Sequence, residues 1–99
     1  MSPVEWTVCG EVEEWRGPSP YFFLPMSVED SAELKLEAAG LEYWGQVAVV
    51  VELGDATIET ALFPQGDRYM VPLRAAVRRA EGLEVGMELT ATVRIRYDR

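Results

Sequence analysis

Strict alternation of apolar and polar positions marks both ends of the chain. Near the start, Trp6, Val8 and Val12 alternate with polar or small residues, with the period of two that is typical of a strand with one buried face. Trp15 departs from this phase, and Gly10 tolerates the irregular backbone of a bulge, so we predict a bulge at Gly10. Residues 88–97 alternate without interruption, and their apolar positions are Leu89, Ala91, Val93, Ile95 and Tyr97.

The middle of the chain predicts a β-hairpin. Gly54 and Asp55 suit a two-residue turn with glycine first. That turn fixes the register, because pairing Leu53 with Ala56 sets Val51 opposite Ile58, Val49 opposite Thr60 and Val47 opposite Leu62. One face of the hairpin is then almost wholly apolar. The other face carries Ala48, Val50, Ala61 and Phe63, which is apolar enough for a helix or a second chain to cover it.

Two short helices and further strands complete the prediction. Ser27 begins a capping box, and residues 29–40 contain no β-branched residue before Gly40, so this segment predicts a helix although parts of it alternate. A second helix follows Pro72, with one apolar stripe formed by Leu73, Ala76, Val77 and Ala80 and an end at Gly82. Residues 21–24 read as a short strand with both faces covered, and a reversal at 64–67 leads into another strand.

We therefore predict a mainly β fold, a small closed or split β-barrel of about six strands with two short α-helices. The length of 99 residues suits a single domain, 1–99. No apolar run is long enough to cross a membrane, and the acidic start does not resemble a signal peptide, so we expect a cytoplasmic protein that begins at Met1.

Charge and composition narrow the chemistry. The formal charge of −8 divides into −11 over residues 1–67 and +3 over residues 68–99. Histidine is absent, which removes the usual general base near neutral pH and the commonest metal ligand. Cys9 is the single cysteine and has no partner for a disulfide or a zinc site. We expect no catalytic residues, no cofactor and no metal.

Several motifs share one order and spacing with a known family. These are W-R-G-P-S-P-Y-F-F-L-P at 15–25, W-G-Q-V at 44–47, T-A-L-F-P at 60–64 and Y-M-V-P-L-R-A-A-V-R-R-A-E-G-L-E-V-G at 69–86. Together they resemble the prokaryotic family called domain of unknown function nineteen-oh-five, over roughly Val8 to Tyr97. The resemblance implies a small split β-barrel with no established activity.

The first of these motifs supplies the main candidate site. Flat aromatic faces give apolar contact and an arginine binds carboxylate or phosphate in two places, so Trp15, Arg16, Tyr21 and Trp44 are candidates to bind a small anionic ligand or a protein partner. Gly17 would let a ligand approach the backbone. The alternative is structural: Trp15 and Tyr21 plug one mouth of the barrel and Arg16 pairs with a nearby glutamate.

The basic end of the chain supplies a second hypothesis. Residues 71–93 resemble, more weakly, the swapped-hairpin unit of dimeric transition-state regulators and antitoxins, which bind DNA. The nucleic-acid-binding candidates would then be Arg74, Arg78, Arg79, Arg94 and Arg96. The alternative is neutralisation, with Arg78 meeting Glu81 and with Arg94 or Arg96 facing Glu52 or Glu59 across the sheet. Nucleic acid is the less favoured partner of this acidic chain, which we expect to be a monomer or a homodimer.

Overall fold

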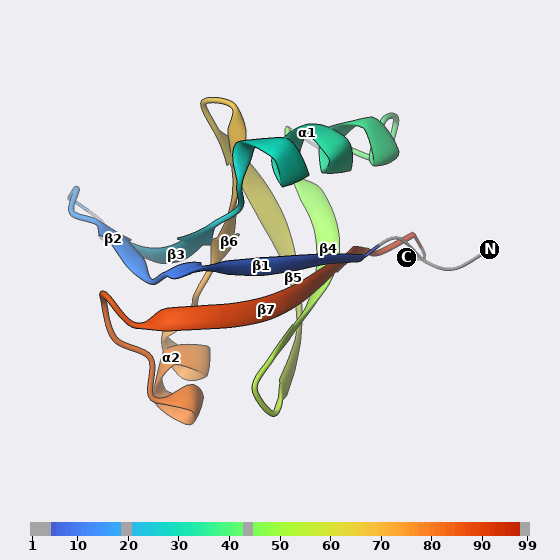
Figure 1. The fold of residues 1–99 in the computed structure, drawn as a ribbon. Helices are drawn as coiled ribbons and strands as arrows, with labels where there is room; N and C mark the ends of the chain where they lie inside the picture. The colour runs from blue at the N-terminus through green and yellow to red at the C-terminus, as the bar shows by residue number, and fades with distance from the viewer. Residues whose placement is uncertain (1–4, 19–20, 43–44, 98–99) are drawn as a thin grey trace.

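The computed structural model describes residues 5–18, 21–42 and 45–97 (Figure 1). Seven strands and two helices follow one another in the order β1 (Glu5–Glu11), β2 (Glu13–Trp15), β3 (Tyr21–Pro25), α1 (Val28–Glu37), β4 (Val47–Leu53), β5 (Ala56–Gln65), β6 (Arg68–Pro72), α2 (Ala75–Glu81) and β7 (Glu88–Ile95). The mainly β class and the two helices were predicted from the sequence. The strand beyond the expected six is β2, which continues from β1 after a break of one residue.

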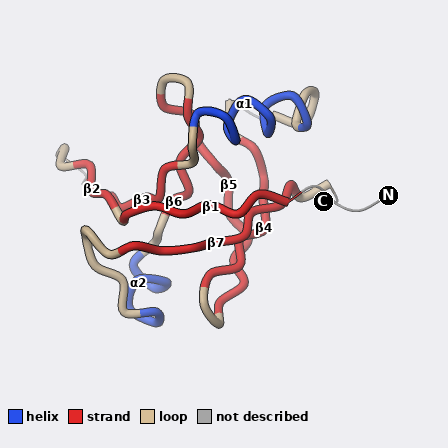
Figure 2. The backbone as a smooth tube through the Cα atoms, viewed as in Figure 1, coloured by secondary structure: helices blue, strands red, loops and turns tan. Residues whose placement is uncertain are grey.

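The strands form one curled, half-barrel sheet in which every neighbouring pair is antiparallel. Its order is β1-β7-β4-β5-β6-β3-β2, and β1 runs alongside β7 (Figure 2). The two edge strands, β1 and β2, are consecutive in the chain, so one segment pairs with β7 in its first part and with β3 in its second. This segment links the two ends of the sheet, which is how a chain this short surrounds a core.

The change of partner occurs at Val12. Its amide donates to the Met87 carbonyl and its carbonyl accepts from the Gly86 amide, each at 2.9 Å. The bulge predicted at Gly10 is wrong, because Gly10 pairs in register with Leu89. The phase shift seen in the sequence at Trp15 arises instead because the chain leaves one ladder at Val12 and joins another.

The β4–β5 hairpin has the predicted register. Leu53 pairs with Ala56, Val51 with Ile58, Val49 with Thr60 and Val47 with Leu62. Gly54 has a φ of 58°, a left-handed conformation that glycine adopts without strain. Val47, Val49 and Val51 are fully buried in the core. A short turn motif therefore fixed which face of β4 points inward.

Helix α1 begins where the sequence predicted. The Ser27 Oγ accepts a hydrogen bond from the Asp30 amide at 3.0 Å, which satisfies one free donor of the first turn. Leu34 and Ala38 are fully buried in the core. Two polar contacts fix the helix to the sheet: the Tyr69 amide donates to the Ser31 Oγ at 2.9 Å, and the Trp6 Nε1 donates to the Glu33 carboxylate at 2.7 Å.

Helix α2 ends at Gly82 as expected, with a φ of 67° at that residue. Its predicted apolar stripe is only partly correct. Leu73 is buried and Val77 is half-buried, whereas Ala76 and Ala80 are exposed. The residues of this segment that pack in or against the core are Leu73 before the helix, Val77 within it and Leu83 after it, while Ala76 and Ala80 remain in water. The two helices lie at opposite ends of the curled sheet (Figure 1), and both segments pack against the same core.

The last strand follows its predicted alternation up to Ile95. Ala91, Val93 and Ile95 are buried and Leu89 is half-buried. Tyr97 does not follow the pattern, because β7 ends at Ile95 and the Tyr97 side chain is exposed. The Arg96 amide still donates to the Ala48 carbonyl of β4 at 2.9 Å, and the alternation in the sequence continues one residue past this contact.

Candidate functional site

The outer surface of the sheet differs in character between its two ends. Over β1, β7 and the end of β4 that carries Glu52, the outward side chains are polar. Thr7 lies opposite Thr92, Cys9 opposite Thr90 and Glu5 opposite Arg94. Ion pairs cross this polar half, with Arg94 3.0 Å from the Glu52 carboxylate. Such a surface is suited to water.

The outer surface over β2, β3, β6 and the end of β5 that carries Phe63 is aromatic instead. We call this the aromatic surface, and its members are Trp15, Tyr21, Phe23, Phe63 and Met70. Tyr21 is central: its ring centroid lies 5.5 Å from that of Trp15, 5.6 Å from that of Phe23 and 5.5 Å from that of Phe63. Phe23 and Met70 are buried by their neighbours, while Tyr21 and Phe63 are half-buried. The cluster therefore has its own packed centre outside the barrel core.

Trp15 is the exposed member of the cluster, with 43% of its surface accessible. Its indole is tilted by 30° against the Tyr21 ring. Gly17 lies directly under the indole, and a Cβ at this position would overlap the ring atoms. The sequence singled out Trp15, Gly17 and Tyr21 together, and the structure brings them together, but Gly17 makes room for a side chain of its own loop. Trp15 and Tyr21 lie on the outside of the sheet and do not plug a barrel mouth.

Arg16 and Trp44 are the other two members of the predicted site. The Arg16 Nε donates to the Glu14 carboxylate at 3.2 Å, and the Arg16 side chain is 83% exposed. This is the glutamate pairing considered as the alternative in the sequence. Trp44 lies outside the described residues.

The five arginines that were candidates for nucleic-acid binding differ in their contacts. Arg94 pairs with Glu52 and lies 3.9 Å from Glu5, and Arg96 pairs with Glu59 at 3.3 Å, so the cross-strand pairings expected from the sequence are confirmed.

Arg78 takes a role that the sequence did not predict. Its guanidinium lies 3.8 Å from the centroid of the Phe22 ring and donates to the Leu73 carbonyl at 2.7 Å, in place of a contact with Glu81. Arg74 and Arg79 are exposed. The positive charges of the C-terminal part are thus largely engaged with acids, a carbonyl and a ring.

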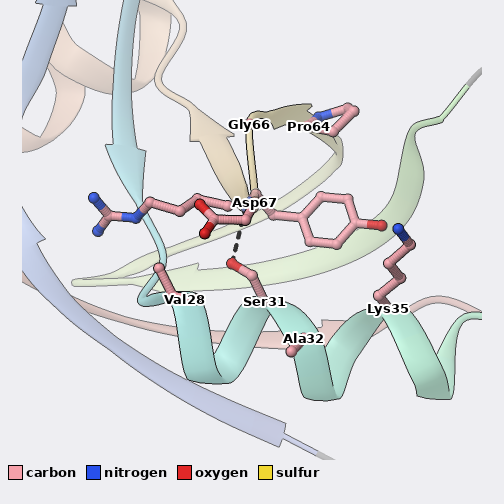
Figure 3. A pocket seen from close by; sticks show the side chains of 9 residues that line it. Val28, Ser31, Ala32, Lys35, Pro64, Gly66 and Asp67 are labelled. Atoms are coloured by element: carbon pink, nitrogen blue, oxygen red, sulfur yellow. Dashed lines mark hydrogen bonds between the residues drawn. The ribbon is translucent and has the colours of Figure 1, made fainter.

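A pocket that the sequence did not predict lies between α1 and the β5–β6 turn (Figure 3). Its volume is about 260 Å³, and its lining residues are Val28, Ser31, Ala32, Lys35, Pro64, Gly66, Asp67, Arg68 and Tyr69. The hydrogen bond from the Tyr69 amide to Ser31 holds the two walls together. The spacing of the helical residues at i, i+3, i+4 and i+7 was a signal of one shared helix face, but the opposite wall is visible only in the fold.

The surroundings act on two polar groups of this pocket. The Arg68 Nε donates to the Met26 carbonyl at 2.7 Å. Burial, and secondarily the nearby Glu42 carboxylate, raise the pKa of the Tyr69 phenol above its ordinary value. The phenol therefore keeps its proton throughout the physiological range.

The fold and these surfaces can be compared with known proteins. A family model described as "Domain of unknown function (DUF1905)" matches residues 9–93. The chain belongs to this family. The resemblance drawn from the sequence motifs is confirmed, and the curled β-sheet is the structure in which this DUF1905 domain places its motifs. No curated protein matches the chain. Within the described residues, none of the helices is long and apolar enough to cross a membrane.

Proposed function

We propose that this DUF1905 domain is a non-catalytic binding domain and that its aromatic surface binds a protein partner. The observation that carries the proposal is the contrast between the two parts of the outer sheet. One part carries threonines and ion pairs, while the other carries five large apolar side chains with Trp15 43% exposed. An exposed aromatic residue on a packed platform is typical of the anchors that dominate the binding energy of protein interfaces.

The partner has apolar anchors and basic side chains around them. Glu13 faces outward beside Phe23, and the positive charge of Arg16 is offset by Glu14, so the rim near Trp15 is acidic. The formal charge of −8 adds attraction at long range to a basic partner and repels a second copy of the chain. The exposed indole also offers its face to an arginine or lysine.

The face of the sheet, and not its edge, is the binding surface. Strand β2 ends the sheet, but it has only three residues and two of them are Glu13 and Glu14. A short edge strand that bears charges is a poor template for strand addition. The ring faces of Trp15, Tyr21 and Phe63 lie beside this edge and supply the contact area.

A small anion at Arg16 has less support than a protein partner, because the anion would compete with Glu14 for the guanidinium. Nucleic acid has less support too, since Arg94 and Arg96 pair with acids and Arg78 lies over Phe22. The absence of histidine from the sequence is consistent with binding without chemistry.

Site-specific cross-linking tests the proposal. The photo-reactive residue benzoylphenylalanine replaces Trp15 in one variant and Thr90, an exposed residue of the polar half, in a matched control. We expect a discrete hetero-complex from position 15 and none from position 90 in cells of the source organism. The captured protein is then purified and titrated by calorimetry against the wild type, Trp15→Ser and Thr90→Ala. Loss of a central anchor should weaken binding by about tenfold or more, while Thr90→Ala binds as the wild type.

Two results would contradict the proposal. One is equal cross-linking from positions 15 and 90, which would show that the aromatic surface has no preference for a partner. The other is a cross-linked homodimer as the single product, which would identify the surface as a self-association face of an acidic chain.

A further inference from the structure

The pocket between α1 and the β5–β6 turn is a separate feature from the aromatic surface. Val28, Ser31, Ala32 and Lys35 project from one face of α1, and Pro64, Gly66 and Asp67 come from the opposite wall (Figure 3). Ser31 is buried and bonded to the Tyr69 amide, so it forms part of the fixed floor. Val28 and Ala32 are apolar, and yet both are exposed to water on α1. These apolar side chains lie where a ligand would cover them.

The pocket also gathers positive charge in a part of the chain that has little of it. Residues 1–67 carry 13 acids and two bases, and one of these bases is Lys35, the single lysine of the protein. Arg68 lines the same pocket, with its Nε held by the Met26 carbonyl. Among the lining side chains, Lys35 and Arg68 are positive and Asp67 is negative, which sums to one positive charge, and the Glu42 carboxylate lies near Tyr69 outside the lining. A ligand with one negative charge fits this balance, and a dianion would meet repulsion from Asp67.

Lys35 has a second, purely structural role, which the test must separate from binding. It lies in the last turn of α1, where a cation interacts favourably with the carbonyl end of the helix. Arginine would serve that role equally well. Glutamine would lose the charge but keep most of the helix propensity.

The size of the pocket limits the ligand further. A volume of about 260 Å³ lies below the usual range of about 300–1,000 Å³ for the sites of drug-sized ligands. Pro64, Ala32 and the Tyr69 ring supply apolar contact. The ligand is therefore small, with one anionic end and a compact apolar body.

We propose that this pocket binds a small monocarboxylate, with the carboxylate paired to Lys35 and the apolar part against Ala32, Pro64 and Tyr69. Arg68 contributes a second positive charge at the pocket wall. The protonated Tyr69 phenol is available as a hydrogen-bond donor. This site does not depend on the aromatic surface, and either one functions if the other does not.

The single lysine makes the test specific. Reductive methylation with ¹³C-formaldehyde adds two labelled methyl groups to Lys35 and keeps its positive charge, so the NMR spectrum contains one lysine signal besides the terminal amine. Benzoate is the probe, and benzamide, which has nearly the same shape without the charge, is its control. We expect benzoate to shift the Lys35 signal saturably, with the millimolar affinity of a ligand of few heavy atoms. Benzamide and sodium chloride at equal ionic strength should produce no saturable shift.

Matched variants separate binding from general charge effects. Lys35→Gln should abolish the thermal stabilisation by benzoate, while Arg79→Gln, which removes one exposed positive charge from α2, should leave it unchanged. Lys35→Arg should retain part of it. Circular dichroism confirms that each variant is folded.

Three results would overturn the proposal: a benzoate shift no larger than the benzamide shift, equal stabilisation of wild type and Lys35→Gln by benzoate, or tighter binding of inorganic phosphate than of benzoate.

Discussion

At the scale of single residues, the close approach of Gly17 to the Trp15 indole is the most specific contact of the aromatic surface. A Cβ at position 17 would overlap the ring, so Gly17→Ala forces the indole away from Tyr21. We expect the variant to lose about 1 kcal/mol of unfolding free energy, the typical contribution of an aromatic pair. Urea unfolding measures the loss, and a changed near-ultraviolet circular dichroism spectrum reports the displaced ring.

The double variant Trp15→Leu with Gly17→Ala provides the control for that prediction. Without the indole there is no overlap, so adding Gly17→Ala to Trp15→Leu should cost almost nothing. An equal cost in both backgrounds would show that the glycine matters for the backbone and not for the ring.

Tyr69 gives a prediction about pH. Its pKa is raised above the ordinary 10.0 by burial and by Glu42, so the folded state holds this proton more tightly than the unfolded state. The resulting stability is fully present below about pH 10 and is lost as pH rises toward the raised folded pKa. Tyr69→Phe removes this component. Unfolding free energies from about pH 9 to pH 11 should therefore fall less steeply for the variant than for the wild type, and parallel slopes would contradict the assignment.

At the scale of elements, α1 is held to β6 by one buried hydrogen bond. The Tyr69 amide donates to the Ser31 Oγ at 2.9 Å, and Ser31→Ala leaves that amide without a partner. We expect a loss of about 1–3 kcal/mol, the cost of an unsatisfied buried donor. Hydrogen exchange should locate the effect, with faster exchange of the Tyr69 amide.

Ser27→Ala is the matched serine substitution on the same helix. It removes the exposed cap on the Asp30 amide and should cost about 1 kcal/mol. The Tyr69 amide should keep its protection in this variant. If both variants expose Tyr69 equally, the helix would detach as a whole and the Ser31 contact would not be its anchor.

The sequence predicted elements well where local chemistry sufficed. The Gly54–Asp55 turn and the valines of β4 specify one register, and the run without β-branched residues specified a helix at α1. The pairings of Arg94 with Glu52 and of Arg96 with Glu59 were among the alternatives that the sequence left open. The β4–β5 hairpin and α1 were predicted because each depends on residues that lie close together in the sequence.

Features that depend on distant segments were missed. The change of pairing partner at Val12 can be predicted only when the positions of β7 and β3 are known. The local sequence indicated Gly10 as the site of the irregularity instead. The pocket forms because α1 lies against the β5–β6 turn, and no local pattern in the sequence predicts that contact. For the aromatic surface, the sequence identified Trp15, Gly17 and Tyr21 as one site and placed Phe63 on the outer face of the hairpin. It did not predict that β5 and β6 bring Phe63 and Met70 into the same cluster.

At the scale of the whole molecule, β4 is the centre of the sheet. It pairs with β5 on one side and β7 on the other, whereas β2 is a short edge strand. Opening β4 requires both ladders to break, so its amides exchange only in large unfolding events. We expect the Val49 and Val51 amides to exchange slowest and the Glu14 amide to exchange much faster, as measured by native-state hydrogen exchange. Fast exchange in β4 would show that the sheet opens through its middle.

The division of the outer sheet has a practical consequence through Cys9. This single thiol is exposed on the polar half, beside Thr90, on a strand that contributes nothing to the aromatic surface or the α1 pocket. A maleimide tether at Cys9 would therefore immobilise every molecule in one orientation on a sensor chip. Both proposed binding regions would then remain accessible to whatever flows over the chip.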